Sequence, residues 1–292
     1  GLGDVYKRQR RQARRRATAP SQATLAGLRQ TPDLLSLGSS VALAVDQDTG
    51  EELFSKNAGI ELPIASVTKL MTALVIAESG LKMDERIRIT REDYVRSNAR
   101  SKLRSGMRMT RGAVLKAALM SSDNRAATAL ARTYPGGRKA FVRKMNETAA
   151  RLGMTDSVFA DPSGLDNRNH ATARDLAKLV AEAHKHEVIR DSSTMQFSSI
   201  RAGRQQLKLV TTNRLIGNPD WNIGVQKTGF TTAAGRCMVV QSEFADRRVV
   251  MVLLDSPNSA QRAADMQTMR TFVENEDRIN EQFGSVRPYE VF

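Results

Sequence analysis

The sequence predicts an α/β fold in which helices cover a single antiparallel sheet of five strands. Two β-rich regions lie far apart in the chain, one at 41–57 and one after residue 222, and a largely helical stretch separates them. Strands bury their apolar faces by pairing, so the simplest arrangement joins both regions in one sheet. The helical stretch, about 84–200, then forms a subdomain inserted between the two halves of that sheet.

The first half of the predicted sheet is a hairpin, VALAVDQDTGEELFSKN, at residues 41–57. Its two β-rich strands flank the turn Asp46–Gly50, which ends in the glycine typical of tight turns. The next stretch, LPIASVTKLMTALVIAESG, predicts a helix over 64–79 that ends at Gly80. Nearly every position after Thr68 is apolar, so we expect this helix to be buried.

The inserted subdomain is predicted from apolar residues that recur with a helical period. They indicate helices at 114–120, 138–153 and 172–185. Thr172, followed three residues later by Asp175, is a capping signal at the start of the third helix.

The second half of the sheet is predicted from three short β-rich segments separated by turn residues. They lie at 222–229, 236–244 and 247–255. A last helix is predicted at about 258–276, where it can cover the sheet.

Charge and length bound the domain organisation. The 292 residues carry a formal net charge of +14, and 40% are hydrophobic, enough for a sizeable core. Residues 1–17 hold seven Lys and Arg against Asp4. We predict a basic, disordered segment at 1–36, one domain at 37–277 and a tail at 278–292. No export signal and no apolar run of membrane-spanning length is visible.

The predicted buried helix begins with a hydroxyl and an amine on one face, at Ser66 and Lys69. Positions three apart are neighbours on a helix, and a helix N-terminus favours negative charge. A serine there is placed to become an attacking alkoxide, and a lysine one turn on can take its proton if burial keeps the lysine neutral. Alone the pattern is a weak signal, because Ser79–Lys82 repeats it without a role.

Two further elements strengthen this interpretation. Ser122-Asp123-Asn124 lies between two helical segments, where its side chains can point into a cleft. Lys227-Thr228-Gly229 ends a predicted strand, and the glycine would let the backbone of a peptide substrate approach closely. The order Ser-x-x-Lys, Ser-x-Asn, Lys-Thr-Gly is the set of penicillin-binding proteins and class A β-lactamases.

From about residue 41 to 264, the chain resembles the low-molecular-mass penicillin-binding proteins, which are serine D-alanyl-D-alanine carboxypeptidases and endopeptidases. The resemblance is carried by ASVTKLMTA (65–73), MSSDNRAA (120–127), YPGG (134–137), TARDLAKL (172–179), TTNRL (211–215) and KTGFTTAAGRC (227–237). It is strongest to the periplasmic D-alanyl-D-alanine endopeptidase branch. The longer carboxypeptidases carry a second β-rich domain and an amphipathic anchor, whereas one helix and a tail follow the last strand here. The resemblance implies a β-lactamase/transpeptidase-like fold and a periplasmic location.

The resemblance also implies catalytic roles. Ser66 attacks the carbonyl of a D-alanyl peptide bond and becomes the acyl-ester, and Lys69 accepts its proton. The Ser122 hydroxyl relays that proton to the leaving amine. The backbone N–H groups of Ser66 and Phe230 form the oxyanion hole.

Substrate-binding roles are implied in the same way. Asn124 holds the substrate amide and the amine of the catalytic lysine. Lys227 supplies positive charge that binds substrate and keeps that amine neutral, and Thr228 binds a substrate carboxylate. Gly229 and Phe230 complete the expected substrate-binding set.

The predicted function is a serine-type endopeptidase that cleaves peptidoglycan cross-links during cell-wall remodelling and is inhibited by β-lactams. The alternatives are a carboxypeptidase that trims pentapeptide stems, a β-lactamase, and a non-enzymatic basic binder of wall polymer or nucleic acid. The intact motif set argues against the binder. Class A β-lactamases carry an E-x-x-L-N loop, but no glutamate here has Leu-Asn at that spacing, and DPSGLDN at 161–167 occupies the region.

The expected partners are peptidoglycan stem peptides and cross-links, with β-lactams as covalent inhibitors. We expect no cofactor, no nucleic acid, no transmembrane segment and no amphipathic anchor. The arginines from 86 to 111 are interpreted as a solvated face. We also expect no metal site, because His170, His184 and His186 do not form a ligand pattern.

Overall fold

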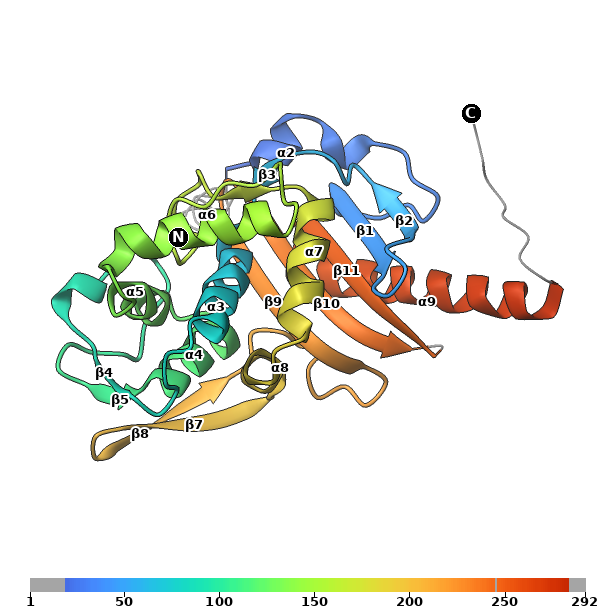
Figure 1. The fold of residues 1–292 in the computed structure, drawn as a ribbon. Helices are drawn as coiled ribbons and strands as arrows, with labels where there is room; N and C mark the ends of the chain where they lie inside the picture. Colours follow the sequence, from blue (N-terminus) through green and yellow to red (C-terminus); the bar gives the residue numbers. More distant parts are fainter. Residues whose placement is uncertain (1–18, 245, 284–292) are drawn as a thin grey trace, which may run out of the picture.

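The fold is built on one antiparallel sheet with strand order β2-β1-β11-β10-β9, as the computed structural model shows for residues 19–244 and 246–283 (Figure 1). The predicted union of the N-terminal hairpin with the C-terminal strands is confirmed, because β1 pairs with β11 and places Leu43 opposite Val252. The five strands are β1 (Val41–Asp46), β2 (Glu52–Lys56), β9 (Asn222–Thr231), β10 (Gly235–Phe244) and β11 (Arg247–Ser256).

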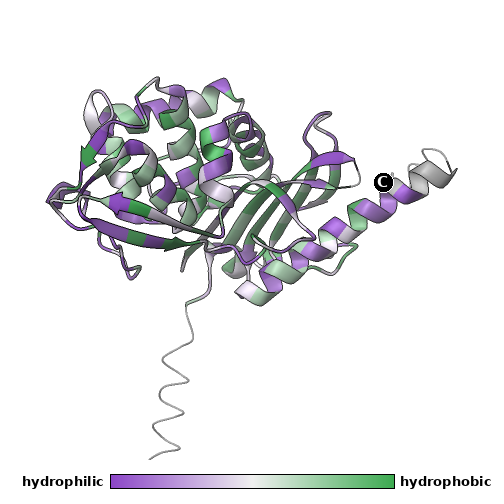
Figure 2. Ribbon diagram, turned by 90° about the horizontal axis from the view of Figure 1, so that it is seen from below, coloured by the Kyte–Doolittle hydropathy of each residue, from purple (hydrophilic) through white to green (hydrophobic). Residues whose placement is uncertain are grey.

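Both faces of the sheet are apolar and both are covered. Along β10, Val239 faces the cluster that includes α7 (Ala173–His184), and Val240 faces α9 (Ser259–Phe283). Figure 2 shows the strands as mainly hydrophobic, with α9 lying along one side of them. The alternation of faces along each strand therefore supplies two layers of core. The last helix extends to Phe283, beyond the predicted 276.

The helical subdomain packs around α3 (Thr68–Glu78), which is buried from Thr68 to Ile76. A short 3₁₀ turn, η2 (Ala65–Val67), leads into it. The predicted helices are present, and the predicted cap is confirmed, since Thr172 Oγ1 accepts a hydrogen bond from the N–H of Asp175 at 3.1 Å. The other helices are α4 (Arg111–Met120), α5 (Asn124–Arg132), α6 (Gly137–Arg151) and α8 (Glu187–Thr194).

Three small two-stranded sheets were not predicted. They pair β3 (Leu62–Pro63) with β6 (His170–Ala171), β4 (Arg86–Arg88) with β5 (Arg108–Thr110), and β7 (Phe197–Ala202) with β8 (Gln205–Val210). The strands β3, β4, β5 and β6 have two or three residues and are too short to show a period in sequence. The strands β7 and β8 have six residues each, and the prediction missed them. The region up to 200 is therefore less purely helical than predicted.

The N-terminal segment corrects the prediction of disorder over 1–36. Residues 19–36 are ordered and include α2 (Gln22–Leu25) and η1 (Leu28–Gln30). Ser21 Oγ donates to Asp255 Oδ1 at 2.6 Å, and an Arg29 N–H lies 3.1 Å from the other oxygen of the same carboxylate. A buried carboxylate needs such donors, so it binds this segment to the end of β11.

The remaining domain predictions are only partly covered. The arginine run in residues 1–17 and the end of the predicted tail lie outside the described residues. Among the helices that are described, none has the length and hydrophobicity needed to cross a bilayer. The division into one domain and two flanking segments otherwise stays a prediction.

Candidate active site

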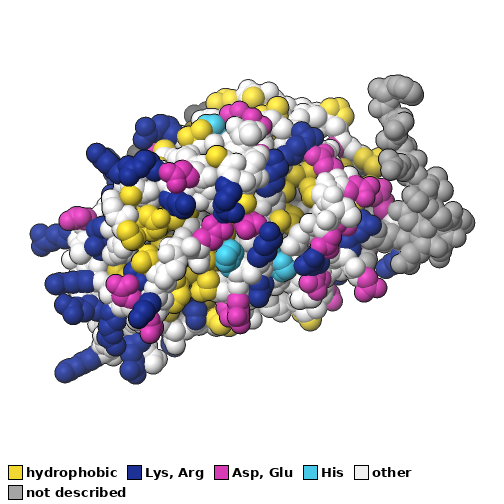
Figure 3. Space-filling model, in the orientation of Figure 1, with side chains coloured by type: hydrophobic (Ala, Val, Ile, Leu, Met, Phe, Trp, Pro, Cys, Tyr) yellow, Lys and Arg dark blue, Asp and Glu magenta, His cyan; other side chains and the backbone are white. Residues whose placement is uncertain are grey.

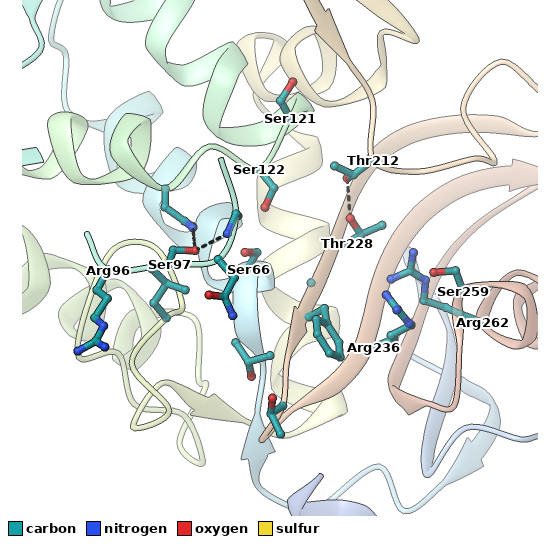
Figure 4. Close-up of a pocket in the computed structure, with 18 residues that line it drawn as sticks. Ser66, Arg96, Ser97, Ser121, Ser122, Thr212, Thr228, Arg236, Ser259 and Arg262 are labelled. Atoms are coloured by element: carbon teal, nitrogen blue, oxygen red, sulfur yellow. Dashed lines mark hydrogen bonds between the residues drawn. The ribbon is translucent and has the colours of Figure 1, made fainter. Parts of the chain in front are cut away.

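The three motifs meet in one cleft of about 660 Å³ between β9 and the helical subdomain. Figure 4 shows Ser66 at its centre, with Ser122 on the subdomain side and Thr228 on the sheet side. Its lining combines hydroxyl, amide and guanidinium groups with the aromatic Phe230. Among the described residues the lining contains no Asp or Glu, so the cleft suits a substrate that carries negative charge.

Ser66 sits in the tight turn η2, and two glycines fix the backbone around it. A Cβ on Gly164 would lie 1.9 Å from the carbonyl oxygen of Ala65, and a Cβ on Gly229 would lie 2.9 Å from Ser66 N. Ala65 itself has a φ of 49°, which is rare for a residue with a side chain. Gly229 lines the cleft, and its own close backbone contact is with Ser66 N. The approach of a substrate backbone to Gly229 stays a prediction.

Lys69 is fully buried and lies within hydrogen-bonding distance of every predicted catalytic group. Its Nζ is 2.7 Å from Ser66 Oγ, 3.3 Å from Ser122 Oγ and 2.7 Å from Asn124 Oδ1. The carbonyl of Ser163 is a further acceptor at 3.1 Å. These contacts hold the amine one turn along α3 from the hydroxyl that it must deprotonate.

Burial changes the charge of the two lysines in the cleft. Burial lowers the pKa of Lys69 to about 7, although Asp123 and Asp161 oppose the shift. Burial, repulsion from Lys69 and repulsion from Arg262 together lower the pKa of Lys227 well below the usual value for lysine. Two amines this close titrate as a pair, so they do not both hold a full positive charge near neutral pH.

Ser122 lies between the two amines. Lys227 Nζ is 3.0 Å from its Oγ, and Lys69 Nζ is 3.3 Å from the same atom. Ser122 has a φ of 55°, and Asp123 holds this strained turn by accepting hydrogen bonds from Ala126 N at 3.0 Å and Ser101 Oγ at 2.7 Å. Asp123, the middle residue of the Ser-x-Asn motif, therefore caps α5 and positions Ser122.

The sheet side of the cleft presents Thr228 and Phe230. The Thr228 hydroxyl shares a 2.6 Å hydrogen bond with Thr212 (Figure 4). Phe230 is 46% exposed, and the guanidinium of Arg236 lies 4.7 Å from the centroid of its ring. All eight residues predicted from the sequence thus lie at or beside this cleft.

Sequence reasoning missed Arg262, which reaches the cleft from α9. It is buried, its Nη1 donates to the carbonyl of Cys237 at 3.1 Å, and its Nε has no hydrogen-bond partner among the described residues. A buried cation that faces a cleft is costly unless an anion occupies that cleft. No sequence motif identifies Arg262. The feature that could have identified it is a charged residue on the face of the last helix that otherwise packs on the sheet.

The loop DPSGLDN was noted in the sequence only as a replacement for a glutamate loop. In the structure its Asp161 is engaged within the loop, with Oδ1 accepting from Gly164 N at 3.0 Å and Oδ2 accepting from Ser163 N at 3.1 Å. The loop offers the cleft the carbonyl of Ser163, directed at Lys69, in place of a free carboxylate.

Among the residues that the structure describes, one group of side chains away from the cleft has the spacing of metal ligands: Glu78, Glu182 and His186. Arg151 donates to both oxygens of Glu78 at 2.7 Å, which satisfies that carboxylate without an ion. This group is a surface ion-pair network and contributes nothing to the cleft.

Comparison with known proteins gives a consistent result. A family model described as D-alanyl-D-alanine carboxypeptidase matches residues 28–258. The chain is 39% identical to a D-alanyl-D-alanine endopeptidase of Pseudomonas aeruginosa, over 88% of this chain and 83% of that one. It is 35% identical to a D-alanyl-D-alanine endopeptidase of Escherichia coli, over 88% and 84%.

The fold is also similar to that of a solved penicillin-binding protein. Penicillin-Binding Protein D2 from Listeria monocytogenes, in its ampicillin-bound form, superposes with a TM-score of 0.72 at 28% identity, covering 82% of this chain and 99% of that one. The predicted β-lactamase/transpeptidase-like architecture is therefore confirmed.

Proposed function

The chain belongs to the D-alanyl-D-alanine carboxypeptidase family of serine peptidases, and from this membership we propose that it hydrolyses D-alanyl peptide bonds in peptidoglycan, with Ser66 as nucleophile. The reaction best supported is cleavage of cross-links, because relatives that match along most of their length are named endopeptidases. Removal of a terminal D-alanine from stem peptides is the second candidate, since the family description is that of a carboxypeptidase.

One observation carries the proposal. The buried amine of Lys69, whose pKa is lowered to about 7, contacts the hydroxyls of Ser66 and Ser122. The Ser122 hydroxyl in turn contacts the amine of Lys227. A lysine in water stays protonated and cannot act as a base at neutral pH. Here a large fraction of Lys69 is neutral near pH 7, which is the condition for general-base catalysis.

Acylation then follows from these contacts. Ser66 Oγ attacks the carbonyl carbon of the D-alanyl bond while its proton passes to Lys69 Nζ, and the carbonyl oxygen becomes an oxyanion. The N–H groups of Ser66 and Phe230 are proposed to bind that oxyanion. When the C–N bond breaks, the Ser122 hydroxyl donates its proton to the leaving amine and regains one from Lys69, which leaves an ester on Ser66.

Hydrolysis of the ester reverses the proton path. After the amine product leaves, water enters the same space, gives a proton through Ser122 or directly to Lys69, and attacks the ester carbonyl. The Ser66–acyl bond breaks, and Ser66 recovers its proton from Lys69. Atoms balance with water as the only co-reactant.

Substrate binding is assigned to the cationic side of the cleft. Thr228 and Arg262 are proposed to bind the carboxylate next to the scissile bond, since Arg262 Nε is buried and without a partner among the described residues. Lys227 adds positive charge when it is protonated. Asn124 Oδ1 accepts from the Lys69 amine, and its NH₂ group donates to Ser97 Oγ at 3.2 Å in the cleft lining, where it is proposed to meet the substrate amide. β-Lactams, which present a similar carboxylate and a reactive amide, are proposed to acylate Ser66. Because the proposed substrate is a cell-wall polymer, we propose that the protein acts in the periplasm.

The proposal is tested by digestion of purified muropeptides with the wild-type protein and Ser66→Ala, followed by mass analysis. We expect cross-linked dimers to fall to monomers with the wild type only. Free D-alanine from pentapeptides without loss of dimers would replace the endopeptidase with the carboxypeptidase. Absence of both products, together with no covalent labelling by a fluorescent penicillin, would refute the peptidase proposal.

A further inference from the structure

A group of unpaired cations covers one end of the helical subdomain. Eleven Lys and Arg side chains there are exposed, and none forms an ion pair with a described residue. Figure 3 shows Lys and Arg projecting at the end of the molecule where Figure 1 places β4, β5, β7 and β8. We call these residues the basic surface: Arg86, Arg88, Arg91, Arg96, Arg100, Lys102, Arg104, Arg108, Arg201, Arg204 and Lys208.

The basic surface is continuous, although its residues come from two distant parts of the chain. Gly203 N donates to the carbonyl of Arg108 at 3.1 Å, which joins the β7–β8 turn to β5. Lys102 Nζ donates to the carbonyl of Lys208 on β8, which makes a second link between the two parts of the chain. At its other end the basic surface reaches the active site, because Arg96 lines the cleft.

Acidic residues do not balance this charge. The two segments that carry the basic surface, residues 86–108 and 201–208, contain two acidic residues, Glu92 and Asp93. Asp93 is buried and forms an ion pair with Arg132 at 2.7 Å. Arginines elsewhere on the surface do have carboxylate partners, such as Arg151 with Glu78 at 2.7 Å. Unbalanced like charges repel one another and raise the local potential, which an anionic partner would relieve.

We propose that the basic surface docks the carboxylate-bearing peptides of the peptidoglycan network beside the peptide that enters the cleft. This inference rests on the proposed function, which supplies a polymeric substrate whose stem peptides end in carboxylates. The protein then binds many weak anionic sites around each cross-link, so cleavage events occur on a polymer that stays near the cleft. Small soluble substrates gain nothing from the basic surface, whereas the intact network does.

Two other anionic partners fit the basic surface less well. Residues 202–205, at the turn of the β7–β8 hairpin, contain no large apolar side chain that could enter a bilayer. Single-stranded nucleic acid needs exposed aromatic rings for base stacking. The β4–β5 segment offers Tyr94, on which the guanidinium of Arg125 already stacks at 3.7 Å from the ring centroid, and the β7–β8 hairpin offers Phe197 at the end of β7 away from the turn. One free ring does not provide the row on which successive bases stack.

The test measures binding without cleavage, in the Ser66→Ala background. The test variant is Arg201→Glu/Arg204→Glu/Lys208→Glu, on a hairpin whose charged side chains lie outside the cleft. The matched control is Lys139→Glu/Arg143→Glu/Lys144→Glu, which makes the same change in net charge on exposed positions of α6. Each protein is sedimented with insoluble peptidoglycan, either native or with its carboxylates converted to amides.

We expect the test variant to bind native peptidoglycan about tenfold more weakly than the parent and the control variant to bind nearly as well. Amidated peptidoglycan, or an ionic strength near 1 M, should remove the difference. Equal binding by parent and test variant, equal loss in the control, or binding indifferent to amidation would each overturn the proposal. Tighter, charge-dependent binding to phosphatidylglycerol vesicles or to a single-stranded oligonucleotide would assign the basic surface to that partner instead.

A kinetic arm separates docking from catalysis. In the active protein, which retains Ser66, the variant Arg201→Glu/Arg204→Glu/Lys208→Glu should leave the penicillin acylation rate unchanged. It should slow the release of products from insoluble peptidoglycan. If the peptidase proposal fails, the sedimentation result still stands, because it needs no turnover. An acylation rate that falls with the charge reversal would mean that the hairpin acts on the cleft and not on the polymer.

Discussion

Lys69 Nζ lies 2.7 Å from Ser66 Oγ, one turn apart at the start of α3. Burial lowers the pKa of this amine to about 7, so its protonation changes within the range in which the enzyme can be assayed. The hydroxyl can lose its proton to the amine only when the amine is neutral. The pH dependence of acylation therefore reports the state of Lys69.

The first prediction is that acylation of Ser66 by a fluorescent penicillin accelerates with pH through about 7 and then levels off. Below that pH most Lys69 is protonated and cannot act as a base, and each unit of acidification should slow the reaction about tenfold. Stopped-flow labelling between about pH 5 and 9 measures this curve. A rate that is flat across the range would exclude Lys69 as the base, and Ser66→Ala gives the unlabelled baseline.

The second prediction concerns Arg262. Arg262→Ala should raise the KM for a peptide that ends in a free D-alanyl carboxylate by roughly 10- to 100-fold, because a charged hydrogen bond is lost. Arg270→Ala is the matched control on the same helix, since Arg270 stacks near Trp221, outside the cleft lining.

A C-terminal amide on the same peptide makes the Arg262 prediction specific. The amide substrate should be poor with the wild type and no worse with Arg262→Ala, because there is no carboxylate to lose. If the variant lowers activity on both substrates by the same factor, Arg262 supports the structure of the cleft without binding the carboxylate.

The third prediction concerns the glycine that presses on the nucleophile turn. A methyl group on Gly164 would collide with the carbonyl of Ala65, and Gly164 has a φ of 90°. Gly164→Ala should lower the free energy of unfolding by about 3 kcal/mol, combining overpacking with left-handed strain. The Gly164 variant should also slow acylation, because Ser66 directly follows Ala65 in the chain.

Gly106→Ala is the control for the Gly164 variant. Gly106 has a φ of 93° and open space around it, so only the backbone strain applies. We expect a loss of about 1 kcal/mol and unchanged acylation. Equal losses in the two variants, measured by denaturant unfolding, would show that the contact with Ala65 does not constrain the turn.

The elements that the sequence predicted correctly are those whose apolar pattern extends over several residues. The apolar run after Thr68 and the continuous apolar run at 249–254 are long enough to indicate a buried helix and a buried strand. The cleft could be predicted from three motifs because each fixes its residues locally, by a helix turn, a cap or a strand end. Their convergence in space was implied by family resemblance and not by spacing.

The features that could not be predicted depend on contacts between distant residues. The burial of Arg262 and its direction toward the cleft follow from the packing of α9 on the sheet, which no local pattern reports. The order in residues 19–36 depends on the carboxylate of Asp255, which lies more than 200 residues away. The prediction of disorder came from the arginine-rich run in residues 1–17 and was extended to residue 36, although residues 19–36 hold only one arginine and one aspartate.

The fourth prediction tests the role of Asp255 in ordering the N-terminal segment. Its oxygens accept hydrogen bonds from Ser21, Ser40 and Arg29, so an amide there would set an NH₂ group against donors. Asp255→Asn should lower the free energy of unfolding by about 2 kcal/mol and expose the N-terminal segment to proteolysis.

The matched control for Asp255 is Asp246→Asn. Both aspartates have a φ of 53°, which Asn tolerates, but Asp246 is exposed. Little change is expected in either measurement for the control. Resistance of Asp255→Asn to proteolysis near residue 25, measured by mass mapping, would contradict the assignment of this carboxylate as the anchor.

The last prediction separates a wall peptidase from a β-lactamase, which shares its motifs and its fold. Class A β-lactamases clear their acyl-enzyme with a glutamate that activates water. In this protein the corresponding loop contributes Asp161, whose oxygens bind Ser163 N and Gly164 N, and the cleft lining among the described residues has no carboxylate. Lys69 remains the base, but a penicilloyl group keeps its leaving amine tethered in the space that water must enter. Penicillin should therefore acylate Ser66 and remain bound for minutes or longer, whereas a peptide acyl group releases its amine and turns over. Intact-protein mass spectrometry after a pulse of penicillin and removal of free drug measures the adduct directly. An adduct that vanishes within seconds, while many drug molecules are hydrolysed per protein, would mean that water reaches the ester by a route that these contacts do not provide, and that the enzyme is a β-lactamase.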